Sequence, residues 1–512
     1  MFKITFDLYK PNGVLTMIKA KLKEAIKEGI RIAETALPKW IYDYLVEAYE
    51  NSEGRAKAQL GAILRNIELA VKERKPMCQD TGLLVFSIKL GRDFPISYRD
   101  LIGIIEESLR EATSEIPIRP NTMDPLTGFN PGDNTGKGMP IVEIEEINEG
   151  DALEISIRPK GGGSEYPSKL CMIPPSMGLK GVKECLFKAI LDAGGKPCPP
   201  GIVSVAFGGT VEEAVKLSKS NLYRKGKHLE ERISKLEEKW KQEINALNIG
   251  PMGLGGTPTI LDLKIDYNYR HPASYPVAVT FNCWAARESR IRIKRDGSWE
   301  VISENVTSKD LLHIEDINVQ ARELKLPVDS NEVRKLKAGD VVYVTGTIVT
   351  ARDEAHKKII EEGKPPIDLK GLAIYHCGPV VKKEGTEWKV IAAGPTTSAR
   401  MNELEAKVLE ITGAKLVIGK GGMKRDLLDT FSRYGAAYLA FPGGAALLAA
   451  KAIKRVKGVY WLEELGIPEA MWVFEVERFG PLIVAMDSHG NSLYEEVNKA
   501  AVENAKRYLK EI

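Results

Sequence analysis

The chain has 512 residues, of which 43% are hydrophobic and 28% are charged, and its formal net charge is +3. This length predicts two to four domains, and the near-balance of 73 basic and 70 acidic side chains argues against a dedicated nucleic-acid-binding protein. No apolar run reaches the roughly 20 residues needed to cross a bilayer, so we expect neither nucleic acid nor a membrane as a partner.

Six cysteines are too few for a disulfide scaffold in so long a chain. The first residues, 1–7, carry neither the apolar block of a signal peptide nor the composition of a transit peptide. We therefore expect a cytoplasmic protein in a reducing compartment.

In the first half of the chain, apolar residues recur at helical spacing over 15–37 and 60–71, which predicts two amphipathic helices. The apolar run 83–88 predicts a buried strand, so Cys78 is expected on a loop between helix and strand. Residues 119–140 are rich in Pro, Gly, Asn and Asp, and such a long irregular segment is typically functional or disordered. Further strands are expected at 152–157 and 202–207.

Residues 211–246 predict a long helical region whose many charges we interpret as a solvated face. The segment 287–338 has few strong core patterns, so we expect a domain boundary there. Beyond it, strands are expected at 341–349, 390–393, 416–418 and 482–486, and helices at 401–412, 425–434 and 445–456. The fold class expected from these elements is mixed α/β (α+β).

Three cysteines lie in short segments rich in turn-forming or polar residues. They are Cys78 in M-C-Q-D-T-G, Cys198 in P-C-P-P-G and Cys283 in N-C-W. Zinc ribbons and electron-transfer clusters usually bring their cysteines as close pairs, so three separated thiolates fit better a metal centre with one open position. A cubane iron–sulfur cluster of this kind would serve as a Lewis acid, although the spacing alone does not establish it.

The other three cysteines are interpreted as structural. Cys171 and Cys185 lie in apolar surroundings and are expected in the core. Cys377 follows His376, but no further ligand lies nearby at metal spacing, so a metal pair is disfavoured.

Several glycine- or threonine-rich segments carry a cation where an anion could bind. The run 160–164 (K-G-G-G-S) offers backbone N–H groups. Arg352, Arg400 and Lys420 each stand at an expected strand end or helix start. Singly, each cation is by default a surface charge; together they predict a carboxylate-binding pocket.

Taken together, these segments resemble the class I, iron–sulfur-dependent fumarases and the related tartrate dehydratases. The matching motifs run in a fixed order along most of the chain. They are C-Q-D-T-G at Cys78, K-G-G-G-S at Lys160, C-P-P with G-G-T at Cys198–Thr210, H-x-A-S at His271 with Cys283 twelve residues on, G-T-I-x-x-x-R-D-x-A-H at Gly346–His356, and G-P-T-T-x-x-R-M at Gly394–Met401.

The resemblance implies a chain in which the family's α and β subunits are fused. The implied domains are an N-terminal mixed α/β cluster domain (1–290), a linker region (291–335) and a smaller C-terminal substrate-binding domain (336–512) of the swivelling β/β/α type. The implied active site lies between the two domains. A homodimer is the default expectation for a symmetric soluble enzyme.

The resemblance also implies residue roles. Cys78, Cys198 and Cys283 would ligate a [4Fe–4S] cluster with one open iron. Asp80 with His271 would exchange a proton with the departing oxygen, and Thr396 would take the proton from carbon. The implied substrate-binding residues are Gln79, Arg119, Gly161, Ser164, Arg352, Thr397, Arg400 and Lys420.

The implied activity is the reversible hydration of fumarate to (S)-malate, with a small dicarboxylate as the partner. L-tartrate dehydratase or a hydro-lyase on a substituted fumarate is the nearest alternative. The chain has Glu165-Tyr166-Pro167 near where fumarases usually continue with Asn, and Tyr275 where some fused members carry cysteine; the first departure touches the substrate loop. An iron–sulfur sensor without turnover is disfavoured by the full set of polar residues, and electron transfer by the ligand count.

Overall fold

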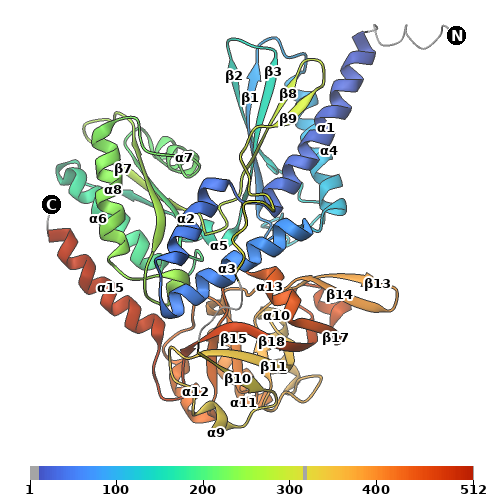
Figure 1. The fold of residues 1–512 in the computed structure, drawn as a ribbon, viewed down its shortest axis with the longest axis vertical. Coiled ribbons are helices and arrows are strands. Elements are labelled where there is room, and N and C mark those ends of the chain that lie inside the picture. Colours follow the sequence, from blue (N-terminus) through green and yellow to red (C-terminus); the bar gives the residue numbers. More distant parts are fainter. Residues whose placement is uncertain (1–10, 315–319, 511–512) are drawn as a thin grey trace. The chain divides into compact units, whose positions relative to one another are not determined.

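The computed structural model describes residues 11–314 and 320–510 of the chain (Figure 1). Its longer helices are α1 (Pro11–Thr35), α2 (Lys39–Glu50), α3 (Gly54–Glu73), α4 (Tyr98–Glu115), α6 (Gly178–Ala193), α7 (Val211–Asn221), α8 (Glu231–Asn245), α10 (Asp353–Glu362), α11 (Glu405–Thr412), α12 (Leu427–Tyr434), α13 (Ala446–Ala452) and α15 (Leu493–Lys510). The expectation about a leader concerns residues outside this description.

The strands form four sheets. The strands are β1 (Leu83–Gly91), β2 (Ile141–Ile147), β3 (Ala152–Lys160), β4 (Lys169–Met172), β5 (Gly201–Phe207), β6 (Ile260–Tyr267), β7 (Pro276–Phe281), β8 (Ser289–Lys294), β9 (Trp299–Val301), β10 (Ala321–Lys325), β11 (Val341–Thr350), β12 (Ala373–Tyr375), β13 (Val380–Glu384), β14 (Glu387–Ala392), β15 (Leu416–Gly419), β16 (Ala437–Ala440), β17 (Ile453–Tyr460) and β18 (Met471–Met486). The fold is a mixed α/β fold, as expected.

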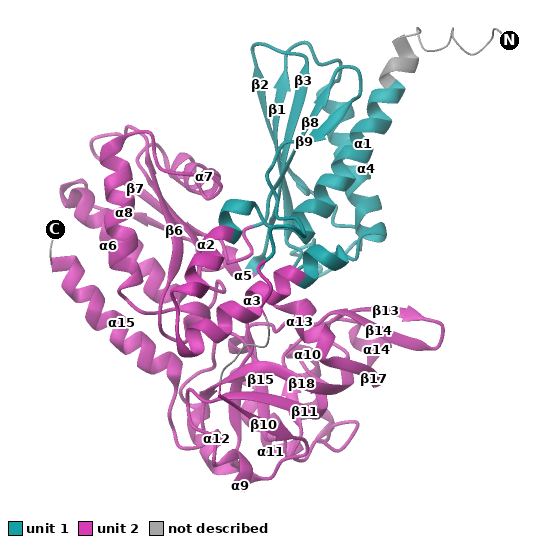
Figure 2. Cartoon of the chain, in the orientation of Figure 1, with its two compact units in different colours: residues 1–42, 69–162, 287–311 teal, residues 43–68, 163–286, 312–512 magenta. Residues whose placement is uncertain are grey.

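The chain forms two compact units, each made of several chain segments (Figure 2). Unit 1 comprises residues 1–42, 69–162 and 287–311, and unit 2 comprises residues 43–68, 163–286 and 312–512. The expected domain limits at 290 and 336 remain a prediction.

Unit 1 is a five-stranded sheet with helices α1 and α4 packed together beside it (Figure 1). The strand order is β2-β1-β3-β8-β9, with β1 parallel to β2 and antiparallel to β3. Burial alternates along β1 and β3, so one face of the sheet is buried. Phe86, Ile155 and Ile291 from this face join Ile26 of α1 and Leu101 of α4 in one core.

Unit 2 contains a four-stranded sheet, ordered β4-β7-β5-β6, in which β5 and β7 are buried at every position. Helix α6 packs on this sheet, and its apolar residues share a core with β5 and β7. The buried strand β5 starts three residues after Cys198, and β7 ends two residues before Cys283. The sheet therefore fixes the two cysteine loops at neighbouring strand ends, because β5 and β7 are hydrogen-bonded partners.

The last part of unit 2 is a closed ring of strands. Strand β11 pairs with β12 and with β18, and the order β11-β12-β15-β16-β18 returns to β11. A ring without edges can bury its whole interior, and the core here includes Tyr375, Phe441, Trp472, Phe474 and Phe479. The segments after β11, β14 and β15 carry the predicted substrate residues of this half, which are Arg352, Thr397, Arg400 and Lys420.

Three sequence predictions differ from the structure. The region 211–246 is two helices, α7 and α8, separated by a loop in which Gly226 has a φ of +77°. The helix expected over 445–456 ends at Ala452, and the chain continues directly into β17. The segment 287–338 contains β8, β9 and β10, and the alternating burial of Ser289–Lys294 shows why β8 is a genuine half-buried strand.

None of the described helices is long and apolar enough to span a bilayer.

Candidate functional site

In unit 1, the Cys78 loop lies between α3 and β1, as expected, and holds Asp80 in place. One carboxylate oxygen of Asp80, Oδ1, accepts hydrogen bonds from Gly82 N at 3.2 Å and from Arg119 Nη2 at 3.1 Å. The other oxygen, Oδ2, accepts one from Gly162 N at 3.0 Å. A side chain at Gly161 would crowd this carboxylate, because a Cβ there would lie 3.2 Å from Oδ2. Unit 1 thus brings Asp80, Arg119 and Gly161 together.

The irregular segment 119–140 is tied to the same loop. Arg119 N donates to Thr81 Oγ1 at 3.0 Å, and Asn121 Nδ2 donates to the carbonyl of Gly82 at 3.0 Å. Gln79, beside Cys78, is 6% exposed. This segment is therefore an ordered partner of the cysteine loop.

A buried ion pair outside the sequence motifs also contacts this loop. Glu34 of α1 lies 2.5 Å from Arg287, and both side chains are almost fully buried. Arg287 Nη2 also donates to the backbone carbonyl of Asp80 at 2.9 Å. The motif analysis missed both residues because they lie outside the matched segments.

In unit 2, the loops of Cys198 and Cys283 are neighbours. Trp284 N donates to the carbonyl of Cys198 at 3.3 Å, and Trp284 Nε1 donates to the carbonyl of Gly443 at 2.7 Å. Cys198 has a φ of +55°, which is strained for a residue with a side chain. Its thiol lies so close to Gly443 that a Cβ at that glycine would overlap the sulfur. The backbone is therefore shaped around this thiol.

Lys420 joins the Cys198 loop to the carboxylate-binding residues predicted for the second half. Its Nζ lies 3.0 Å from Cys198 Sγ. The sulfur of Cys198 and the ammonium of Lys420 are therefore direct neighbours. The backbone of Lys420 bonds to the threonine loop on both sides: its N–H donates to Thr396 O at 3.3 Å and its carbonyl accepts from Ser398 N at 3.0 Å. Unit 2 therefore brings Cys198, Lys420, Thr396 and Thr397 together.

Arg352 and Arg400 meet around Asp353 at the start of α10. Arg400 is paired with the Asp353 carboxylate. Arg352, the residue before it, lies 3.0 Å from Glu469 and donates to the carbonyl of Pro468 at 3.3 Å. Burial raises the pKa of Glu469, and Arg352 opposes that rise. Both cations have acidic partners that fix their side chains.

His271 and Ser164 show only local features in unit 2. His271 is exposed, and its Nδ1 accepts a hydrogen bond from Ala273 N at 3.1 Å. Ser164 is buried within the short helix α5 (Gly162–Glu165). The expected pairing of His271 with Asp80 remains a prediction, as does the joining of Cys78 to the other two cysteines.

The three selected cysteines suit a cluster by their chemistry. All three are outside the disulfide, sit on loops, and offer soft sulfur donors; Cys78 and Cys283 are half-buried, whereas Cys198 is buried. Gly443 leaves room for the Cys198 sulfur, and the Lys420 ammonium that contacts this sulfur complements the negative charge of a metal-bound thiolate. These residues therefore fit an iron–sulfur cluster of the kind the sequence predicted.

The interpretation of Cys171 and Cys185 as separate core thiols was wrong. The two sulfur atoms form a disulfide that links β4 to α6. Cys185 is buried and Cys171 is half-buried, so apolar surroundings alone could not distinguish a thiol from a bridge.

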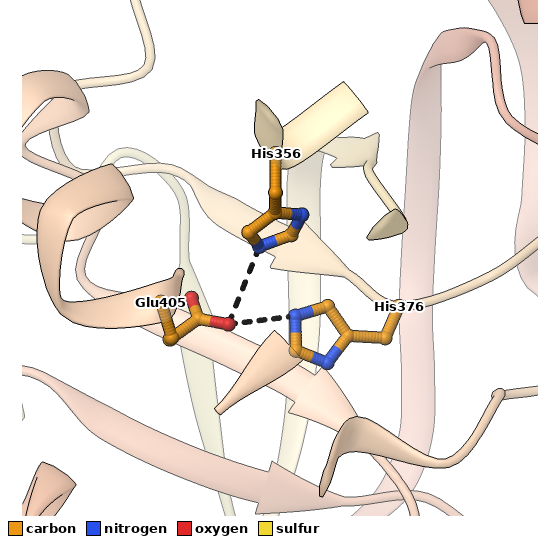
Figure 3. Close-up of side chains that lie close together, drawn as sticks. All are labelled: His356, His376 and Glu405. Atoms are coloured by element: carbon orange, nitrogen blue, oxygen red, sulfur yellow. Dashed lines mark hydrogen bonds and ion pairs between the residues drawn. The ribbon is translucent and has the colours of Figure 1, made fainter. Parts of the chain in front are cut away.

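His376 has partners that the sequence analysis missed. His356, His376 and Glu405 place one ligand atom each within 4.8 Å of one another, and all three are fully buried (Figure 3). His376 is followed by Cys377 in the sequence, and this neighbour suggested a metal pair without further ligands. The partners in the structure lie 20 residues before His376 and 29 residues after it. His356 closes a matched motif, and this was the one available signal.

Comparison with known proteins covers almost the whole chain. A family model described as "Fumarate hydratase (Fumerase)" matches residues 23–292, and one described as "Fumarase C-terminus" matches residues 295–497. Over 512 residues the chain is 36% identical to "Putative fumarate hydratase class I" of Geobacillus stearothermophilus, which covers 95% of this chain and 98% of that protein. Two Methanocaldococcus jannaschii proteins match the two halves. "Putative L(+)-tartrate dehydratase subunit alpha" is 40% identical over 283 residues (54% of this chain, 99% of that protein), and the corresponding "subunit beta" is 57% identical over 176 residues (34% and 90%).

Proposed function

The chain belongs to the fumarate hydratase family of hydro-lyases, and from this premise we propose that it hydrates fumarate reversibly to (S)-malate with a [4Fe–4S] cluster. The observation that carries the proposal is the 3.0 Å contact between Lys420 Nζ and Cys198 Sγ. It joins a predicted substrate cation to a predicted cluster ligand, which is the combination that a Lewis-acid hydro-lyase needs.

The cluster would be held by Cys78, Cys198 and Cys283. When bound, it supplies Lewis-acid polarisation of the carbon–oxygen bond that forms or breaks. The protein's own residues supply the rest. Arg352, Arg400, Lys420 and Thr397 bind the two carboxylates and stabilise the negative charge that builds up on one of them when carbon loses its proton.

Two proton transfers complete the reaction. In dehydration, Thr396 takes the proton from carbon, and the Asp80–His271 couple gives a proton to the departing hydroxide, so that water leaves; in hydration both steps reverse. Asp80 suits its role because Arg119, Gly82 and Gly162 fix the direction of its carboxylate. Gln79, Gly161 and Ser164 line the substrate side.

L-tartrate dehydration is the second candidate. The C-terminal part of the chain is 57% identical to a protein named "Putative L(+)-tartrate dehydratase subunit beta", and this identity supports the second candidate. So does the exposed Tyr166 beside the glycine run, where fumarases usually carry Asn. The two substrates differ by one hydroxyl, and a site built to bond that hydroxyl would discriminate strongly. A homodimeric, cytoplasmic enzyme is part of the same proposal.

The first test is anaerobic purification followed by iron and sulfide analysis and turnover assays. We expect about four irons per chain and loss of the fumarate absorbance, reversed when malate is supplied. Dehydration of tartrate without turnover of fumarate would assign the second candidate. A protein that cannot acquire a cluster after anaerobic reconstitution would contradict both.

Two single-cysteine variants test the ligand assignment, one at a predicted ligand and the other as its matched control. Cys283→Ser should abolish turnover and lower the iron content, because it removes one ligand. Cys377→Ser, which changes a buried cysteine outside the predicted ligand set, should keep both. Equal losses in the two variants would contradict the ligand assignment.

A further inference from the structure

A chain of buried polar side chains crosses the strand ring of unit 2, and the proposed reaction does not use it. His356 comes from α10, His376 follows β12, Ser398 begins the short helix η4 (Ser398–Met401), and Glu405 begins α11. These four and Tyr438 of β16 are fully buried. Figure 3 shows that the two imidazoles converge on one oxygen of Glu405. Buried polar groups of this kind are costly unless they are satisfied, so their arrangement carries information.

The distances fix where the protons lie. His356 Nδ1 is 2.8 Å from the carbonyl of Arg352, and Nε2 is 3.3 Å from Glu405 Oε2. Both partners of this ring only accept hydrogen bonds once Glu405 is ionised, so the ring carries two protons and is an imidazolium.

His376 has one hydrogen bond and one close ion-pair contact. Its Nε2 lies 2.9 Å from Glu405 Oε2, and its Nδ1 lies 2.8 Å from Ser398 Oγ. Tyr438 donates its hydroxyl to Ser398 Oγ at 3.0 Å. The Ser398 hydroxyl is therefore able to donate to Nδ1, while Nε2 lies in ion-pair contact with Glu405. The chain runs from Tyr438 through Ser398 and His376 to Glu405, and His356 supplies the compensating positive charge.

The electrostatics agree with this assignment. Burial alone would raise the pKa of Glu405, but its interactions with His376 and His356 lower it to about 2. Burial opposes the charged form of His356, yet the bond to Glu405 raises its pKa. Burial lowers the pKa of His376. One anion, one cation and one neutral ring therefore share the site.

Two members of this chain, His356 and His376, are each hydrogen-bonded to the backbone of a proposed substrate or catalytic residue. His356 holds the backbone carbonyl of Arg352, and the carbonyl of His376 accepts the N–H of Thr396 at 2.7 Å. Ser398 N donates to the carbonyl of Lys420. The loops that carry Arg352, Thr396 and Lys420 thus have a common buried anchor.

We propose that Glu405 is a positioning residue, which acts through His356 and His376 to set the geometry of Arg352 and Thr396 for turnover. The inference rests on the proposed function, because it assigns these two residues to substrate. A displacement of about 1 Å at such a site costs up to roughly 100-fold in rate. A buried charge that locks two loops would prevent that displacement.

Glu405→Gln tests the proposal because it keeps the side-chain shape and removes the charge. We expect kcat to fall roughly 10- to 100-fold and KM to change by about threefold or less, because Arg352 keeps its own contacts to Glu469 and Pro468. Glu405→Asp, which restores the charge, should recover part of kcat. Glu410→Gln on the same helix, where the exposed carboxylate pairs with Lys407, is the matched control and should match the wild type.

Two further readouts separate positioning from loss of structure or cofactor. The iron and sulfide content of Glu405→Gln should equal that of the wild type. The downfield proton NMR resonances of slowly exchanging imidazole N–H groups should be present in the wild type and in Glu410→Gln, and lost or shifted in Glu405→Gln. If Glu405→Gln does not fold, Ser398→Ala removes the hydroxyl that links Tyr438 to His376 and should lower kcat by about three- to tenfold.

The contradicting outcomes are distinct. A folded Glu405→Gln variant, or failing that a folded Ser398→Ala variant, with wild-type kcat overturns the proposal. So does one transition-metal ion per chain, beyond the cluster iron, that Glu405→Gln loses, because the three side chains would then be a metal site. A wild-type enzyme that turns over neither fumarate nor tartrate refutes the proposed function instead, and the NMR resonances then still report whether the buried chain exists.

Discussion

Lys420 shows at the scale of one residue how the backbone directs a charge. It follows directly after β15, and both its N–H and its carbonyl are bonded to the threonine loop. The direction of its side chain is therefore fixed by the main chain, and its Nζ reaches the Cys198 sulfur. The same ammonium can stabilise a thiolate and attract a carboxylate, so its removal should affect both cluster and substrate.

We expect Lys420→Met to lower kcat/KM by about 10- to 100-fold, which corresponds to the loss of one charge-assisted hydrogen bond. Lys424→Met is the matched control, because that lysine is exposed and pairs with Glu403 alone, and it should keep wild-type kinetics. Kinetic assays with parallel iron determination make the measurement. Equal kcat/KM for the two variants would show that Lys420 is only a surface charge.

Site residues that stand in recognisable sequence motifs could be predicted from the sequence. Cys78, Cys198 and Lys420 stand in glycine- or proline-rich segments at strand ends, and the structure has them on loops there. Glu405 was not open to prediction, because a glutamate in the first turn of a helix is ordinarily solvated. Only tertiary packing buries it against His356 and His376, which come from two other elements.

At the scale of elements, strands with a clear apolar run were predicted well and short half-buried strands were not. The runs that predicted β5 and β11 match strands within one residue at either end. The alternating residues of β8 went unrecognised among charged neighbours, although the strand is the partner of β3. The helix predicted past Ala452 failed because β17 is held by pairing with β18, a contact distant in sequence.

The bridge between β4 and α6 gives a prediction at this scale. Cys171 and Cys185 are 14 residues apart, and closing a loop of that size stabilises a fold by about 3 kcal/mol in the chain-entropy model. Replacing both cysteines by serine should lower the thermal midpoint by roughly 4 °C, because the unfolding entropy of a unit of this size is large. Calorimetry on the variant and the wild type measures the difference.

Thiol counting provides the control for the bridge. Alkylation of the denatured, unreduced and cluster-free protein should modify four of the six cysteines, and prior reduction should expose all six. Alkylation of all six without reduction would contradict the bridge and restore the original interpretation of two core thiols.

For the whole molecule, the buried carboxylate of Glu405 links stability to pH. Its pKa is lowered to about 2 in the folded protein, against an ordinary value of 4.5. A carboxylate with a depressed folded pKa stabilises the fold above its unfolded pKa, and the contribution is lost as pH falls toward the folded value. The shift corresponds to about 3 kcal/mol, present above about pH 5 and lost progressively toward pH 2.

The histidines that face Glu405 modify this dependence in opposite directions. The lowered pKa of His376 means that the unfolded chain takes up a proton first, so stability begins to fall below about pH 6.5. The raised pKa of His356 gives a contribution that is full below about pH 6.5 and lost as pH rises through its folded value. Asp353, at the start of α10, is a further charged group close to both histidines.

We therefore expect the wild type to lose stability on the acid side and Glu405→Gln to lose less, so that the gap between them narrows as pH falls from 6 to 3. Thermal midpoints of both proteins across this range, with the same buffer ions at each pH, measure the gap. Glu410→Gln should follow the wild type at every pH, because its carboxylate is exposed. A gap that stays constant from pH 6 to pH 3 would show that Glu405 has the same pKa in the folded and unfolded states, and a gap that widens as pH falls would show that its folded pKa is raised.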